Sequence, residues 1–229
     1  MNIHGLQKMT LLDFPEHVAC TVFLGGCDFR CPFCHNFGLA TGSDKPVMND
    51  GELMDFLKTR TGILDGVAFT GGEPCLYGEL PDLLRRIRSL GFATKLDTNG
   101  YHPALLKRIL DEKLVDYVAM DIKNSPEKYA ATCGVGTVDI GIIKESISAI
   151  MGSGTEYEFR TTVVEEFHDT SDFSKIGGMI RGADRYFLQC FTDRPSVPFG
   201  NLHAPSKEKL EEYAAEARKY VKTATVRGV

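Results

Sequence analysis

Three cysteines close together in the chain are the residues best suited to chemistry. Cys27, Cys31 and Cys34 are spaced as Cys-x3-Cys-x2-Cys, and a loop with this spacing can fold round a small metal centre. Thiolates are soft ligands, which favour zinc or an iron–sulfur cluster over hard cations. A closed zinc site or an electron-transfer cluster needs a fourth protein ligand. His35 is awkwardly placed because it directly follows Cys34, and Cys75 is the better candidate, although a small, partly buried residue is the preferred interpretation of Cys75. Three ligands without an obvious fourth indicate a cluster with one iron open to a substrate or cofactor.

The number of cysteines and the N-terminal sequence together indicate the cellular compartment of the protein. The chain has seven, an odd number that cannot all pair within one chain. Residues Met1–Asp13 contain no basic stretch followed by an apolar one, so we expect no signal peptide. The longest apolar run, Val18–Leu24, is too short to cross a membrane. We therefore expect a soluble, cytoplasmic protein, in which clustered thiols bind metal or act in catalysis more often than they form disulfides.

Composition excludes several classes of function. The 229 residues include 26 Lys and Arg against 31 Asp and Glu, a net charge of −5, which argues against a nucleic-acid-binding surface. Hydrophobic residues make up 43% of the chain and charged residues 25%, enough to bury a sizeable core. No repeat, low-complexity tract or linker divides the sequence. We expect one domain over residues 1–229, with a lead-in at 1–16 and a C-terminal helix and strand at 206–229.

Strand and helix patterns alternate along the chain. Runs rich in β-branched and aromatic residues predict seven strands, the last of them weak, at 17–24, 66–70, 92–97, 115–122, 156–164, 185–191 and 222–227. Amphipathic patterns between them predict six helices, which begin near Asn49 or Asp50, Pro81, Pro103, Ile143, Thr170 or Ser171, and Ser206. This alternation predicts parallel strands with right-handed crossovers. We expect an α/β fold, a partial (β/α)6 TIM-like barrel, with a doubly wound open sheet as the competitor.

Four unusual segments follow successive predicted strands. The cysteine loop follows the first strand, residues 71–74 follow the second, residues 97–100 end the third and residues 121–123 end the fourth. Ligands bind at the carboxyl ends of parallel strands in both barrels and open sheets. The sequence therefore predicts a site at this rim. Arg160 and Gln189, on the fifth and sixth strands, are expected to point into the barrel.

Two motifs carry a resemblance to a known family. Residues 27–34, Cys-Asp-Phe-Arg-Cys-Pro-Phe-Cys, resemble the cluster-binding signature of radical S-adenosylmethionine (SAM) enzymes, and Gly-Gly-Glu-Pro at 71–74 after a strand strengthens the resemblance. Cys-His-Asn at 34–36 and Leu-Asp-Phe-Pro at 12–15 are similar to activating enzymes of glycyl-radical enzymes. Within that group the chain most resembles the activating proteins of anaerobic ribonucleoside-triphosphate reductase. The resemblance covers nearly the whole chain.

The resemblance implies cofactors and the residues that hold them. Cys27, Cys31 and Cys34 are expected to bind a [4Fe–4S] cluster whose fourth iron is chelated by SAM. The residues that the resemblance assigns to SAM are Phe33, His35 and Asn36 near the adenine, Gly71, Gly72 and Glu73 at the amino group, Asp97, Thr98 and Asn99 at the ribose or methionine end, and Lys123 at the carboxylate, with Arg160 a candidate for SAM or substrate. A simple strand-to-helix turn is the less favoured interpretation of residues 71–73, because a glutamate buried at the mouth of a barrel would be costly without a cationic partner.

Similarity to pyruvate formate-lyase activating enzyme adds a monovalent cation beside the SAM carboxylate, held by Asp97 and Asp121. Two acids at one rim need a cation or a shared proton. The alternative interpretation is that Asp121 pairs with Lys123, or with Arg160 across the barrel.

The resemblance also implies an activity. The reduced cluster would cleave SAM to a 5′-deoxyadenosyl radical, which would take a hydrogen from a backbone glycine of a partner glycyl-radical enzyme, with anaerobic ribonucleotide reductase as the expected partner and reduced flavodoxin or ferredoxin as the electron source. Asp13 resembles a position that meets the glycine-bearing loop. Only isolated cysteines follow Cys34, so the inserted ferredoxin-like clusters of some relatives are missing. The alternatives are a radical SAM enzyme acting on a small molecule, and a non-catalytic zinc or iron–sulfur module with a fourth protein ligand.

Overall fold

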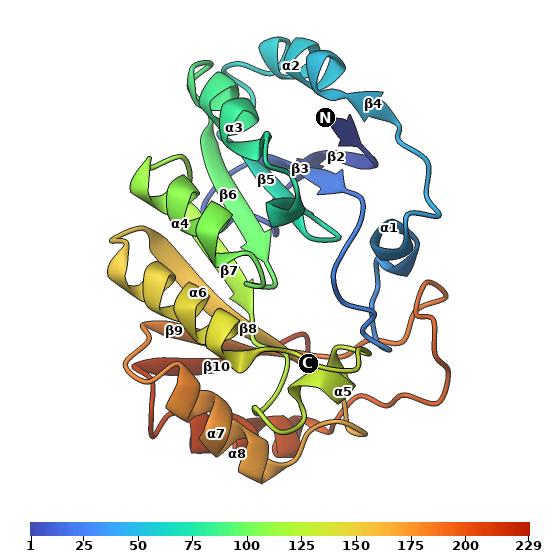
Figure 1. Ribbon diagram of the computed structural model, residues 1–229, viewed down its shortest axis with the longest axis vertical. Coiled ribbons are helices and arrows are strands. Elements are labelled where there is room, and N and C mark those ends of the chain that lie inside the picture. The colour runs from blue at the N-terminus through green and yellow to red at the C-terminus, as the bar shows by residue number, and fades with distance from the viewer.

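One curved sheet of eight strands organises the molecule, which the computed structural model describes over residues 1–229 (Figure 1). Seven strands run parallel to one another, and only β2, at one edge, runs antiparallel to its neighbour β3. In spatial order the strands are β10 (Thr223–Arg227), β9 (Arg185–Cys190), β8 (Glu156–Val163), β7 (Tyr117–Asp121), β6 (Ala93–Thr98), β5 (Gly66–Gly71), β3 (Ala19–Leu24) and β2 (Gly5–Thr10). The edge strands β10 and β2 each pair with a single neighbour, so the barrel is open.

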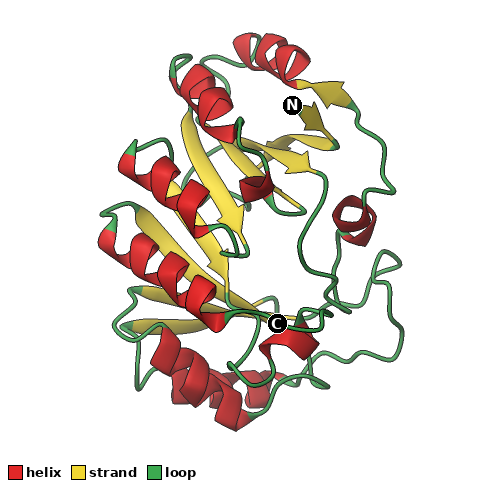
Figure 2. Cartoon of the chain, in the orientation of Figure 1, coloured by secondary structure: helices red, strands yellow, loops and turns green.

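Helices cover the outer face of this sheet (Figures 1 and 2). They are α2 (Asp50–Lys58), α3 (Leu80–Arg88), α4 (Pro103–Asp111), α6 (Ile140–Gly152), α7 (Thr170–Met179) and α8 (Lys207–Ala217). Because the long helices lie on one face of a curved sheet, the architecture is a partial barrel of the TIM type, as predicted, and the doubly wound alternative is wrong. No helix combines the length and the apolar character that a membrane span requires.

The shorter elements lie outside this pattern. Two short helices, α1 (Phe37–Thr41) and α5 (Tyr129–Thr132), and a 3-10 turn at Pro74–Leu76 belong to loops that follow strands β3, β7 and β5. The remaining strands, β1 (Asn2–Ile3) and β4 (Met48–Asn49), form a separate antiparallel pair.

Side chains alternate between two cores along the strands. Val22, Phe69 and Met120 face the helices and belong to a large apolar core of 50 buried residues. Phe14 and Tyr117 belong instead to a small cluster near the amino ends of the strands, their rings 6.3 Å apart. The segment that joins β2 to β3 therefore fills this end of the barrel and leaves the carboxyl ends for the site.

The seven predicted strands and six predicted helices all occur, with small differences at their ends. Asn49 and Ser206 cap helices as predicted, but α7 is capped by Asp169, which accepts a hydrogen bond from Ser171 N, and not by Thr170 or Ser171. The sequence did not predict β2, because all but one of the residues of this edge strand are exposed or only partly buried, so the strand lacks an apolar pattern.

Candidate functional site

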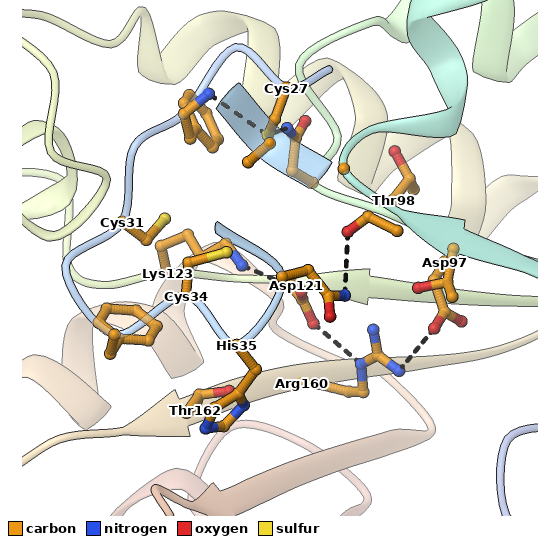
Figure 3. A pocket seen from close by; sticks show the side chains of 18 residues that line it. Cys27, Cys31, Cys34, His35, Asp97, Thr98, Asp121, Lys123, Arg160 and Thr162 are labelled. Atoms are coloured by element: carbon orange, nitrogen blue, oxygen red, sulfur yellow. Dashed lines mark hydrogen bonds and ion pairs between the residues drawn. The ribbon is translucent and has the colours of Figure 1, made fainter. Parts of the chain in front are cut away.

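A cavity lies at the carboxyl ends of β3, β5, β6, β7 and β8 (Figure 3). The strand register places the rim residues side by side: Leu24 pairs with Gly71, and Asp121 pairs with Arg160. Nearly every residue that the sequence assigned to cluster, SAM or cation lines this cavity, namely Cys27, Cys31, Phe33, Cys34, His35, Asn36, Gly71, Gly72, Asp97, Thr98, Asn99, Asp121, Lys123 and Arg160. Glu73 is the exception.

Some residues that line the cavity were not predicted from the sequence, and one residue that was expected to point into the barrel does not line the cavity. Phe29, Thr70 and Thr162 also line the cavity. Thr162 lies two residues after Arg160 on β8, so both side chains point to the same face of the sheet. The two-residue period of a strand could therefore have predicted that Thr162 lines the cavity. Gln189 does not line the cavity. Asp13 accepts a hydrogen bond from Thr21 Oγ1 at 2.6 Å and does not line the cavity, and its contact with a partner's glycine-bearing loop stays a prediction.

The cysteine loop has no helix or strand and is held by contacts from other loops. Arg30 N donates to the carbonyl oxygen of Cys133 at 2.8 Å, and Asn99 Nδ2 lies 3.7 Å from Cys27 Sγ. Asn36 Nδ2, just after the loop, donates to the carbonyl of Gly71 at 3.2 Å. The loops after β5, β6 and β7 therefore fix the loop that carries the thiols.

His35 extends away from its backbone toward the loop after β9. Its Nε2 donates to the carbonyl oxygen of Thr192 at 2.7 Å, and its ring stacks on Phe191 with an interplanar angle of 3°. The His35 side chain thus joins the cysteine loop to a segment 157 residues later. This bond uses the Nε2 atom of His35 and leaves its Nδ1 atom and its backbone groups open to a ligand.

The three thiols of the cavity differ in acidity. Burial raises the pKa of Cys27 to about 11 and also raises that of Cys34. A hydrogen bond from the Cys133 thiol, helped by Lys123, lowers the pKa of Cys31 to about 7. Metal binding needs thiolates, so a cluster that binds here must displace protons, above all from Cys27.

The donor set of the cavity fits an iron–sulfur cluster. Cys75, the sequence's candidate for a fourth ligand, is fully buried beside Thr98 Oγ1 at 3.8 Å and does not line the cavity. No three His, Cys, Asp or Glu side chains lie close enough to share a single metal ion. A cubane binds each thiolate through a different iron, so its ligands stand farther apart than those of zinc. Three separated thiols at one cavity therefore suit a cluster better than a zinc ion.

The two glycines at the end of β5, Gly71 and Gly72, allow a close approach of backbones. Gly71 has φ +117°, and a Cβ on Gly72 would lie 1.8 Å from the carbonyl oxygen of Gly26. Glu73 N donates to the same carbonyl at 2.8 Å. Glycine is needed here because any side chain would push the loop after β3 away from β5.

Glu73 turns its carboxylate into the protein. The side chain is 0% exposed and accepts hydrogen bonds from Cys75 N at 2.9 Å, Thr98 Oγ1 at 2.8 Å and Asn99 N at 2.6 Å. Burial raises the pKa of Glu73, and the three donors oppose that shift. Three hydrogen-bond donors satisfy the carboxylate, so its burial does not require a cationic partner within the protein.

Charged side chains from three strands form a network under the cavity (Figure 3). Arg160 Nε donates to Asp121 Oδ1 at 2.9 Å, and its NH1 lies 3.3 Å from Asp97 Oδ2. Lys123 Nζ binds Asp121 Oδ2 at 3.0 Å, and Lys95 Nζ binds Asp97 Oδ1. Burial is the largest single influence and would raise the pKa of both aspartates, but Arg160 together with Lys95 at Asp97, and with Lys123 at Asp121, holds each pKa below its usual value. The sequence left open whether Asp121 pairs with Lys123 or with Arg160, and it pairs with both.

Hydrogen bonds to Lys123 and to the two residues that follow it hold this part of the backbone. The Lys123 carbonyl accepts a hydrogen bond from His168 Nε2, and the following Asn124 Nδ2 donates to Phe167 O at 2.9 Å. Ser125 Oγ donates to Asp172 Oδ1 at 2.6 Å. The backbone that carries Lys123 is therefore fixed by the segment between β8 and α7.

Comparison with known proteins agrees with this geometry. Residues 21–170 match the family model of the radical SAM superfamily. A protein of Methanocaldococcus jannaschii, provisionally named a glycyl-radical enzyme activating enzyme, is 29% identical over 99% of this chain and 96% of its own length. The pyruvate formate-lyase-activating enzyme of Clostridium pasteurianum is 30% identical over 78% of this chain and 76% of its own.

Solved structures share the fold. SuiB of Streptococcus suis bound to S-adenosylmethionine superposes on 91% of this chain with a TM-score of 0.69 at 14% identity, and the chain spans about half, 52%, of SuiB. Native anSMEcpe with bound AdoMet and the Kp18Cys peptide gives a TM-score of 0.63 over 86% of this chain and 57% of its own, at 16% identity. The cofactors of the radical SAM superfamily are a [4Fe–4S] cluster and SAM, which fit the three thiols of the cavity. Together with the partial barrel and the sequence relatives, this shows that the chain belongs to the radical SAM superfamily and, within it, to the activating enzymes of glycyl-radical enzymes.

Proposed function

We propose that this protein cleaves SAM reductively and abstracts a hydrogen atom from one backbone glycine of anaerobic ribonucleoside-triphosphate reductase. When bound, the reduced cluster supplies the electron that breaks a carbon–sulfur bond of SAM. The observation that carries the proposal is the set of three thiols in the cavity lining, which contains no fourth cysteine. A glycine Cα between two amides gives a stabilised radical, which makes glycine a suitable site to store one.

The cavity residues take roles that follow from their chemistry. Cys27, Cys31 and Cys34 hold the cluster. The backbone carbonyls of Gly71 and Gly72 accept from the SAM ammonium, since the Glu73 carboxylate is used internally. Lys123 and Arg160 receive the SAM carboxylate. The remaining assignments are Phe33, His35 and Asn36 at the adenine, the latter two through backbone groups, and Asp97, Thr98 and Asn99 at the ribose or methionine end.

The filled interior of the barrel supports a substrate that reaches in from outside. Below the charged network, Tyr117 donates to Glu158 at 2.8 Å, and Arg227 binds both oxygens of Glu158 at 2.9 and 3.0 Å. These side chains leave the mouth of the barrel as the place for a substrate. A flexible glycine-bearing loop of a partner protein fits such a mouth, and we propose that residues 1–229 act as one radical SAM domain in receiving it.

The test is to mix the anaerobically reconstituted protein, SAM and reduced flavodoxin or ferredoxin with anaerobic ribonucleotide reductase. We expect 5′-deoxyadenosine to form and a glycyl-radical signal to appear on the reductase. The control replaces the reductase by a variant whose radical-bearing glycine is alanine, which should give no such signal. SAM cleavage without a radical on any glycyl-radical enzyme would contradict the proposal and favour a small-molecule substrate.

A further inference from the structure

All four carboxylate oxygens of Asp97 and Asp121 are already bound by cationic side chains. Arg160 binds one oxygen of each aspartate, at 3.3 and 2.9 Å, and the two remaining oxygens bind Lys95 and Lys123. A monovalent cation held by these two aspartates would need at least one of these oxygens. Its binding would therefore place it next to a lysine ammonium or the Arg160 guanidinium on a shared oxygen, and these like charges repel.

The net charge of this network also disfavours the binding of an additional cation. Three cationic side chains, Lys95, Lys123 and Arg160, face two aspartates, so the network carries one surplus positive charge. None of the five side chains is more than 28% exposed. A bound K⁺ or Na⁺ would raise the surplus to two charges in a poorly solvated layer, where unbalanced charge is costly.

Arg160 suits the role of a permanent positive charge between the two acids. It lies opposite Asp121 in the register of β7 and β8 and reaches across to Asp97 on β6. Its guanidinium is planar, keeps its charge at every accessible pH and can bind two acceptors at once. An ordinary lysine at this position would offer one point charge and not a fork.

We propose that Arg160 takes the place of a monovalent cation between Asp97 and Asp121, so that this protein binds SAM without added K⁺ or Na⁺. The surplus charge of the network then matches the single negative charge of the SAM carboxylate. The inference deepens the proposed function, because it assumes that SAM binds in this cavity.

The direct test measures SAM affinity by anaerobic titration calorimetry on the reconstituted wild-type protein. The buffer contains KCl, NaCl or tetramethylammonium chloride at equal ionic strength. We expect dissociation constants that agree within about threefold, which is under 1 kcal/mol. Binding tighter in K⁺ or Na⁺ by more than that would overturn the inference and leave the proposed function intact. Failure to bind SAM in every salt would instead refute the placement of SAM and with it both proposals.

A variant separates the charge of Arg160 from the rest of the network. Arg160→Gln should weaken SAM binding by about tenfold or more in tetramethylammonium chloride, and K⁺ or Na⁺ should restore part of the loss. The matched control is Arg185→Gln, because Arg185 on β9 pairs with Glu156 and lies outside the network. Iron content and far-ultraviolet circular dichroism verify that both variants are folded and loaded. Unchanged SAM affinity of a loaded Arg160→Gln protein would overturn the role of Arg160.

Discussion

The Nε2 atom of His168 donates a hydrogen bond to the backbone carbonyl of Lys123 at 2.9 Å. His168 is buried, and its Nδ1 accepts from Val164 N at 3.2 Å. These two bonds fit the neutral ring, in which one nitrogen donates and the other accepts. The backbone of Lys123, which lines the cavity, is therefore held by a histidine whose ring is neutral.

This arrangement predicts a pH dependence of folding stability. Burial lowers the pKa of His168, so below about pH 6.5 the unfolded chain takes up a proton that the folded protein resists. The free energy of unfolding should fall as the pH decreases from 7 to 5, by at most about 1.4 kcal/mol per pH unit from this one group. Urea titrations of the cluster-free wild type and His168→Gln measure the difference. Equal slopes against pH in both proteins would show that His168 does not titrate as expected.

Glu73 should contribute to stability through its three donors. In Glu73→Gln the amide group would face backbone N–H groups with a donor of its own, leaving at least one buried polar group unsatisfied. We expect a loss of about 1–3 kcal/mol in the free energy of unfolding, measured by urea titration. Glu79→Gln, an exposed glutamate on the same loop, is the control and should change stability by less than about 0.5 kcal/mol. Similar effects of the two substitutions would contradict the internal role of Glu73.

Gly72 should tolerate no side chain. The Cβ of Gly72→Ala would meet the Gly26 carbonyl at 1.8 Å, so the two loops must separate. We expect a cost of about 3 kcal/mol or more, seen as a lower Tm and a lower iron content after reconstitution. Gly78→Ala has nothing within 4 Å of its Cβ and serves as the control. A Gly72→Ala protein as stable as Gly78→Ala would show that the close approach is not required.

Substitutions of Cys31 and of Cys75 should have different effects on the cluster. Cys31→Ser should lose most of its iron and form no 5′-deoxyadenosine, because Cys31 lines the cavity. Cys75→Ser should keep about four irons per chain, the content of one cubane, because Cys75 lies outside the cavity. Iron analysis and product chromatography measure both. Comparable loss in the two variants would make Cys75 a ligand.

Much of the site was predictable because parallel strands bring their carboxyl ends to one edge. Cys27, Gly71, Asp97 and Lys123 are separated in sequence, yet each ends or follows a predicted strand and each lines the cavity. This inference required only strand order and direction, and local patterns supply both. The edge strand β2 escaped prediction because its exposed side chains carry no such pattern.

Side-chain direction was less predictable, because it depends on partners far along the chain. The inward turn of Glu73 is set by donors at Thr98 and Asn99, and the direction of His35 by Thr192. The pairing of Arg160 with both aspartates follows from cross-strand register. A pattern of residue types in one sequence contains none of this information.

The central claim is that one iron of the cluster is open and binds SAM. Its most direct test is the electron paramagnetic resonance spectrum of the reduced, anaerobically reconstituted protein, recorded before and after SAM is added. The account predicts that SAM changes the g-values of the reduced cluster. A spectrum that SAM leaves unaltered, in protein that carries about four irons per chain, would contradict it.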